Sequence, residues 1–274
     1  MSRNQDRLGG VQQPDTSPPP QQGGGGFSFV VPTEFVDLPS QGRFYPEGHP
    51  LHGKDCIEIK QMTAKEEDIL TSRTLLKKGV ALDKLIESLI VDKTINPASL
   101  LVGDRNAIII ATRVSGYGNV YETNVTCPAC QTKQRYSFDL NSANIIHGQA
   151  SEKLQVTDNG DGTITCVLPK TQVTVVARLL TGKEEKNLIN TANTDTLIST
   201  QLQSIIVSVN GDSSQQAIDY LSNNLPSFDS RHLRMVMKMA TPNIDLTQQF
   251  SCTNCDYTQE MEVPLTADFF WPDR

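Results

Sequence analysis

The sequence has few of the residues and patterns that mark several large functional classes. Of its 274 residues, one is tryptophan, four are histidine and 6% are aromatic. No stretch approaches the roughly 20 consecutive apolar residues that a membrane span needs. The first residues lack the apolar core of a signal peptide. We therefore expect a protein assembled inside a cell, without a membrane span, in which thiols stay reduced.

Basic residues are not in excess either. The chain has 24 lysines and arginines against 31 acidic residues, a formal net charge of −7. A protein that binds nucleic acid by neutralising phosphates needs the opposite balance. The sequence also has no glycine-rich phosphate loop, no HExxH motif and no nucleophile elbow. This composition favours a non-enzymatic protein that contacts other proteins and has no small-molecule substrate.

What is present begins with a biased N-terminal segment. Residues 1–26 contain no aromatic residue and end in a run of prolines and glycines. Such a segment cannot bury enough apolar surface to offset the entropy lost on ordering, so we expect a flexible tail.

After this segment the sequence repeats a set of landmarks in one order. "MTAKEEDIL" at 62–70 resembles "LTGKEEKNL" at 180–188, and "SLIV" is followed 116 residues later by "SIIV". An aspartate and two cysteines then recur at a constant offset of 125, from Asp104, Cys127 and Cys130 to Asp229, Cys252 and Cys255. Thr-x-x-Glu is a common helix-capping box, so the first match alone could arise by convergence. Four landmarks in order indicate two tandem copies, residues 27–150 and 151–274.

Both copies predict the same series of elements. Each begins with a strand or hairpin, continues with a capped helix and a second amphipathic helix, and has a third helix that starts at the aspartate. Each ends in a strand, a CxxC turn and a returning strand. We therefore predict an α+β fold of two pseudo-equivalent repeats. The extra length around "NGDSSQQAIDYLSNN" is expected to be a loop insertion in the second copy.

The paired cysteines suggest a metal centre. A CxxC turn between two strands is half of a zinc ribbon, and tetrahedral Zn²⁺ needs two such turns. We predict that Cys127, Cys130, Cys252 and Cys255 bind one shared, structural Zn²⁺. Separate or empty knuckles and a redox-active pair remain as alternatives. Cys56 and Cys166 are expected to be free thiols.

Three other short motifs have less specific interpretations. His49 and His52 lie in a proline- and glycine-rich loop and are not expected to bind metal. "DNGDG" is expected to be a hairpin turn, because it lacks the later acidic ligand of a calcium loop. Arg43, Phe44 and Tyr45 are of types enriched at protein interfaces, so we predict a partner contact there; packing within their own domain is the alternative.

Two stretches support a resemblance to a known family. "FVDLPSQGRFYPEGHPLHG" and "IEIKQMTAKEEDILTSRTLLKKGVALDKLIESLI" resemble the baseplate proteins of T-even-like contractile-tailed bacteriophages, within the family of baseplate hub subunits and hub assembly proteins. The resemblance covers roughly residues 35–140. It implies a virion structural or assembly protein without catalytic residues, located in the tail baseplate and assembled in the host cytoplasm. Its partners would be other baseplate and tail-tube subunits.

A zinc-ribbon nucleic-acid-binding or regulatory protein is the alternative from another class. Lys133, Arg135 and Tyr136 beside the first CxxC favour it. The acidic residues beside the second oppose it, namely Asp256, Glu260 and Glu262.

Overall fold

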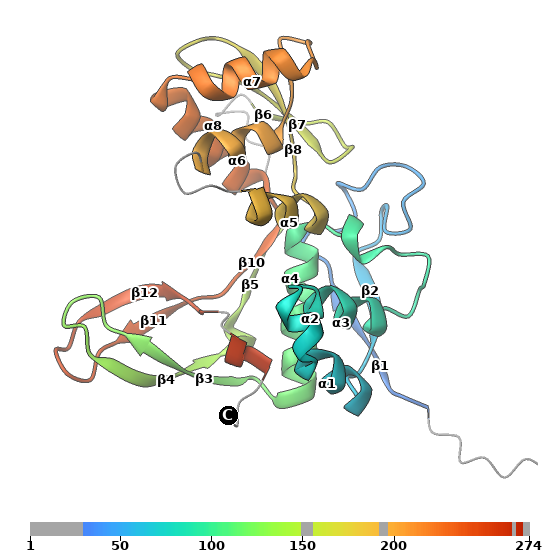
Figure 1. Cartoon of the computed structure of the whole chain (residues 1–274), viewed down its shortest axis with the longest axis vertical. Coiled ribbons are helices and arrows are strands. Elements are labelled where there is room, and N and C mark those ends of the chain that lie inside the picture. The colour runs from blue at the N-terminus through green and yellow to red at the C-terminus, as the bar shows by residue number, and fades with distance from the viewer. Residues whose placement is uncertain (1–29, 149–155, 192–196, 265–266, 271–274) are drawn as a thin grey trace, which may run out of the picture. The chain divides into compact units, whose positions relative to one another are not determined.

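The computed structural model describes residues 30–148, 156–191, 197–264 and 267–270. The predicted tail, residues 1–26, lies outside the described residues. The unit that starts at Pro32 combines helices with several small antiparallel sheets, which confirms the α+β class (Figure 1).

The first half pairs two strands and then adds helices and a hairpin. Strand β1 runs antiparallel to β2, with Phe35 opposite Glu58. The elements in order are β1 (Thr33–Asp37), β2 (Cys56–Lys60), α1 (Ala64–Thr71), α2 (Arg73–Lys77), α3 (Ala81–Leu89), η1 (Pro97–Ser99), α4 (Val102–Tyr117), β3 (Val120–Thr126), β4 (Lys133–Asp139), η2 (Leu140–Ser142) and β5 (Asn144–Ile146).

The second half contains a four-stranded antiparallel sheet in the order β6-β7-β8-β9. Its elements are β6 (Val156–Asp158), β7 (Thr163–Val167), β8 (Thr174–Arg178), α5 (Gly182–Thr191), α6 (Leu197–Ile205), β9 (Ile206–Val209), α7 (Gln215–Asn224), α8 (Ser227–Ala240), β10 (Asn243–Asp245), β11 (Thr247–Ser251), β12 (Thr258–Glu262) and η4 (Ala267–Phe270). The prediction that the extra residues form a loop is wrong in one respect, because most of them form helix α7.

Both predicted capping boxes are formed. At α1, the amide and hydroxyl of Thr63 donate to the Glu66 carboxylate at 3.1 and 2.5 Å. At α5, the amide and hydroxyl of Thr181 donate to Glu184 at 2.8 and 2.5 Å. Each box pairs orphan backbone groups that a helix start would otherwise leave exposed.

The sequence predicted that the two aspartates cap the third helices, and this prediction is wrong. Helix α4 begins at Val102 and α8 at Ser227, so that each aspartate is the third helical residue. Asp104 instead accepts hydrogen bonds from the amide and hydroxyl of Ser40 at 2.9 and 2.6 Å and from the Tyr45 hydroxyl at 2.8 Å. A buried carboxylate needs such partners.

Asp229 makes the corresponding contact in the second half. Its carboxylate accepts from the amides of Lys170 and Thr171, both at 2.9 Å. Each aspartate thus ties its helix to the turn that follows a Leu-Pro pair, at residues 38–39 and 168–169.

The two halves share one cluster of buried apolar residues. Strand β5 of the first half pairs with β10 of the second, with Ile145 opposite Ile244. Helix α4 packs against the same strand through Gly103, where an added Cβ would collide with the backbone carbonyl of Pro242. Across the described ranges, no helix is both long and apolar enough to span a membrane.

Candidate metal centre

Two hairpins, β3–β4 and β11–β12, carry the paired cysteines at their turns. After each CxxC the next residue has a positive φ, 60° at Gln131 and 53° at Asp256. The amide of Cys127 donates to Thr132 O and that of Cys252 to Tyr257 O, both at 2.9 Å. These tight turns direct the two thiols of a pair to the same side, and the hairpins lie side by side (Figure 1).

The four sulfur atoms lie close together. All ligand atoms of Cys127, Cys130, Cys252 and Cys255 lie within 4.8 Å of one another. Across the hairpins, Cys127 Sγ is 3.8 Å from Cys255 Sγ, and Cys130 Sγ is 3.7 Å from Cys252 Sγ. Four sulfurs at about 2.3 Å from a central Zn²⁺ would be about 3.8 Å apart. A disulfide would need about 2 Å. The convergence expected from the sequence is confirmed, and its spacing matches a tetrahedral metal site.

The thiols differ in burial and in acidity. Cys127 and Cys252 are buried, Cys130 is half-buried and Cys255 is exposed. Hydrogen bonding with the hydroxyl and amide of Thr132 and with the Asn254 side chain lowers the pKa of Cys130 to about 5. The Tyr257 amide lowers the pKa of Cys255, but neighbouring sulfurs outweigh it and raise the value to about 12. Four thiols packed this closely cannot all ionise without a cation, and a soft divalent metal would supply that charge.

Neighbouring polar groups hold the cysteine thiols in place. The amide of Asn254 donates to Cys252 Sγ at 3.4 Å, and its side chain donates to Thr132 Oγ1 at 3.2 Å. The hairpins also bond directly, from Gln134 Nε2 to Ser251 O at 3.0 Å and from the amide of Thr253 to Gln134 Oε1 at 3.0 Å. Such outer contacts orient metal ligands.

The arrangement suits a structural metal. Four protein ligands fill a tetrahedral zinc site and leave no open position for water or substrate. A thioredoxin-like redox pair needs its CxxC at the start of a helix. Both CxxC segments here lie in turns between strands, so the geometry disfavours the redox alternative.

For two of the three predicted interface residues, the structure shows the alternative, which is packing within their own domain. Phe44 and Tyr45 are 4% and 2% exposed and pack within the chain's own core. The Tyr45 hydroxyl is held by Asp104 and the Leu101 amide, which explains its burial. Arg43 is exposed and donates to His147 O at 2.8 Å, so a partner contact at Arg43 stays a prediction.

The remaining sequence candidates have local roles. His49 stacks on Tyr45 and hydrogen-bonds to Ser99, and His52 hydrogen-bonds to Tyr45 O. "DNGDG" forms the turn between β6 and β7, as expected. Cys56 and Cys166 are free thiols, half-buried and buried respectively.

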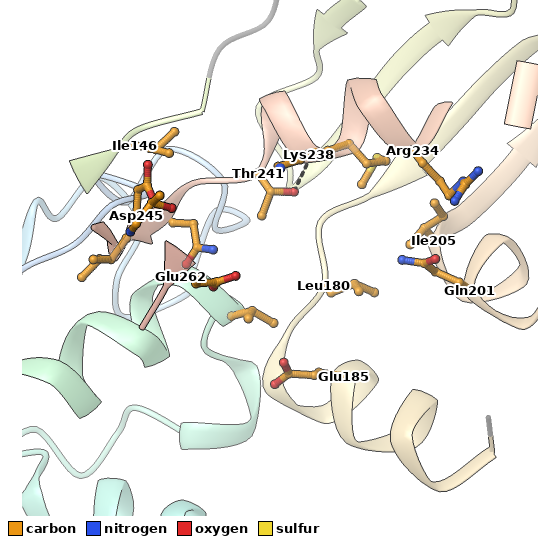
Figure 2. A pocket seen from close by; sticks show the side chains of 15 residues that line it. Ile146, Leu180, Glu185, Gln201, Ile205, Arg234, Lys238, Thr241, Asp245 and Glu262 are labelled. Carbon is orange, nitrogen blue, oxygen red and sulfur yellow. Dashed lines mark hydrogen bonds between the residues drawn. The ribbon is translucent and has the colours of Figure 1, made fainter. Parts of the chain in front are cut away.

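A cavity of about 440 Å³ lies beside α8. Figure 2 shows Arg234 and Lys238 of that helix together with Glu185, Asp245 and Glu262 from other elements. Residues of both charge signs therefore line the cavity. Its lining contains no histidine, cysteine or serine that could form a nucleophile–base pair.

Fold and site together define an α+β protein whose cysteine cluster suits a structural metal rather than catalysis. A family model described as "T4 bacteriophage base plate protein" matches residues 32–271. The chain belongs to this family of phage baseplate proteins, which confirms the resemblance seen in the sequence. No curated protein and no solved structure matches the chain.

Proposed function

We propose that the chain is a structural or assembly component of a contractile phage tail baseplate, in its hub region, where it connects subunits through protein–protein contacts. Membership of the baseplate family across residues 32–271 is the observation that carries this proposal. The closed geometry of the four-cysteine cluster adds support, because it suits a protein that holds a shape.

The cysteine cluster is part of the same proposal. Cys127, Cys130, Cys252 and Cys255 bind one structural Zn²⁺, which would link the first hairpin to the second. Structural zinc contributes roughly 10 kcal/mol or more of apparent binding energy in small zinc domains. This is comparable with the whole stability of a domain.

The chain is also proposed to be a tandem duplication, with copies at 27–150 and 151–274. The corresponding capping boxes and Asp104 and Asp229 support it. So does a pair of ion pairs at one offset: Lys60 contacts Glu66 at 2.9 Å, and Arg178 contacts Glu184 at 3.8 Å.

Nucleic-acid binding has less support. Arg135 beside the first knuckle is paired with Glu122 at 2.5 Å, and the Tyr136 hydroxyl donates to Gln249 O at 2.8 Å. Both groups are therefore used within the protein. A gel shift of nucleic acid by the purified chain that weakens as salt rises would instead favour nucleic-acid binding.

The function is tested in phage that carry an early stop codon in the gene for this chain. We expect electron micrographs of the infected cells to show incomplete baseplates or their precursors, and a plasmid copy of the gene to restore complete tails. A labelled chain should then lie near the tube axis of purified baseplates or their precursors. Normal infectious particles without the chain would refute a structural or assembly role.

A further inference from the structure

Helix α8 presents an apolar and basic face to solvent. Phe228, Met235 and Met239 are 63%, 45% and 44% exposed. Arg231 and Lys238 are exposed on the same side, since steps of three, four and seven residues stay on one helix face. We call these five residues the α8 stripe. Single exposed apolar residues are ordinary, but three on one face, with an arginine among them, have the composition of an interface core.

The corresponding face of α4 is covered within the chain. The positions 125 residues before the α8 stripe are Gly103, Asn106, Ile110, Arg113 and Val114, and none of them is exposed. The same helix face is therefore covered in the first half and open in the second.

Two segments of the second half cover the α4 face: one at the start of strand β10, and one in the 3-10 helix η4. Pro242 lies against Gly103, and the Asn106 side chain donates to Asn243 Oδ1 at 3.2 Å. Farther along, Arg113 Nε donates to Phe269 O at 2.6 Å. At its N-terminal end, a helix face of this kind thus accepts an extended segment, and both covering segments supply oxygen acceptors to its polar positions.

The basic residues of the α8 stripe have no such acceptors within the described ranges. Neither Arg231 nor Lys238 forms an ion pair there. Asp245 lines the same cavity as Lys238, and hydrogen bonds from Thr247, one of them from its amide at 2.9 Å, together with the charge of Lys238 lower its pKa, but Lys238 and Asp245 form no ion pair. Arg231 and Lys238 are separated by about 10 Å along the helix axis, at about 1.5 Å per residue. Two to four residues of an extended strand span a similar length.

We propose that the α8 stripe is the docking face for an extended acidic segment of a neighbouring baseplate subunit. Two carboxylates of this segment pair with Arg231 and Lys238, and an apolar residue between them packs on Met235. Methionine suits the role because its flexible thioether adapts to the surface it meets. The inference rests on the proposed function, since it needs neighbours in a baseplate.

Charge reversal tests the basic pair. The full-length double variant Arg231→Glu/Lys238→Glu and the apolar variant Phe228→Ser/Met235→Ser are expressed in infected cells that lack the wild-type chain. We expect at least a tenfold drop in copies of the chain per purified baseplate or precursor for each. The matched control, Arg73→Glu/Lys77→Glu, makes the same charge change on exposed residues of α2 and should incorporate normally. Circular dichroism and metal content verify that each variant folds.

Photo-crosslinking identifies the occupant. With p-benzoylphenylalanine in place of Met235, we expect a cross-link to an acidic segment of a different subunit. Normal incorporation of both stripe variants overturns the proposal, as does a cross-link to a second copy of this chain or to a non-acidic segment. In those cases the baseplate role itself stands. Absence of the wild-type chain from baseplates and their precursors would instead remove the proposed function and this inference together.

Discussion

Asp104 and Asp229 hold equivalent positions in two helices but ionise in different surroundings. Burial raises the pKa of Asp104, despite hydrogen bonds from Ser40 and Tyr45. Burial also opposes ionisation of Asp229, but the hydrogen bonds from Thr171 and Lys170 outweigh it and lower its pKa. Both carboxyl groups are fully buried, so the same tie between helix and turn is made by a group of raised pKa in one half and by a more readily ionised one in the other.

Removal of the Asp104 carboxylate should be costly. Asp104→Ala leaves the Ser40 amide, the Ser40 hydroxyl and the Tyr45 hydroxyl buried without their acceptor. We expect a loss of about 3–5 kcal/mol in unfolding free energy, measured by urea denaturation. Asp68→Ala, at an exposed position of α1, is the control and should change stability by less than about 0.5 kcal/mol. Equal effects would contradict the role assigned to Asp104.

Glu66 should make stability depend on acid pH. Burial of its side chain raises the pKa, but hydrogen bonds from Ser88, Thr63 and Lys60 outweigh it and lower the value from 4.5 to about 2. The unfolded state therefore binds this proton first, so the stabilisation is complete above about pH 4.5 and is lost as pH falls towards 2.

Urea unfolding of the wild type and of Glu66→Gln checks this dependence. The free-energy gap between the two proteins should be largest at pH 6 and should shrink on going to pH 3, because only the wild type has the carboxylate. A gap that stays constant over this range would show that Glu66 is not the source.

The four thiols should act as one unit. We expect Cys252→Ser to lower bound zinc from about one ion per chain to near zero and to reduce the unfolding free energy by several kcal/mol. Cys56→Ser, at a half-buried free thiol, should keep the metal. Elemental analysis of both purified variants gives the stoichiometry. Retention of a full zinc equivalent by Cys252→Ser would show that the cluster is not the site.

At the scale of elements, the close approach of α4 to β10 depends on Gly103, which has no side chain. An alanine Cβ at position 103 would collide with the carbonyl of Pro242, which is backbone and cannot rotate away. At Gly116, in the same helix, a Cβ would meet only the flexible end of Met62 at 3.0 Å. Gly103→Ala should therefore lower the melting temperature by several degrees, because helix α4 must move away from the backbone at Pro242 to relieve the clash.

Gly116→Ala should be neutral or slightly stabilising, because alanine favours a helix over glycine. Thermal unfolding by circular dichroism compares the two variants. A similar drop in both would mean that helix α4, rather than its contact with β10, is sensitive to substitution.

Local patterns predicted the elements with strong signals. The capping boxes at Thr63 and Thr181, the CxxC hairpins and the amphipathic helices α3 and α6 have short-range sequence signatures, and the structure contains them. Strand β5 has only three residues, and its partner β10 lies almost 100 residues away in the sequence. No local periodicity marks such a pairing.

Tertiary contacts explain the predictions that were wrong. Asp104 looked like a helix cap because capping is the usual role of an aspartate before an apolar helix. Its actual partner, Ser40, is 64 residues away. A partner contact was predicted at Phe44 and Tyr45 because aromatic residues are enriched at interfaces, but both side chains are buried, and the Tyr45 hydroxyl donates to Asp104 in the core. The convergence of the cysteine pairs could be predicted because their identical spacing suggested two halves of one site.

At the scale of the whole molecule, two separate sets of contacts join the halves. One is the cysteine cluster with the hydrogen bonds between its hairpins. The other surrounds α4 and includes the pairing of β5 with β10. Two ion pairs add to this set: Arg105 contacts Glu185 at 3.2 Å, and Lys186 contacts Asp83 at 2.8 Å. Only the first set would depend on a metal.

Metal removal should therefore loosen one junction and leave the other. After chelation of the full-length protein, we expect faster amide hydrogen exchange in β3, β4, β11 and β12, because four clustered thiols without a cation no longer hold the two turns together. Helix α4 and strand β10 should keep their protection, since the ion pairs of Arg105 and the β5–β10 hydrogen bonds remain. Mass spectrometry of peptic fragments measures both regions in one experiment, and added zinc should restore the original pattern. Uniform loss of protection would mean that the metal holds the entire fold, and no change would mean that the hairpins need no metal at all.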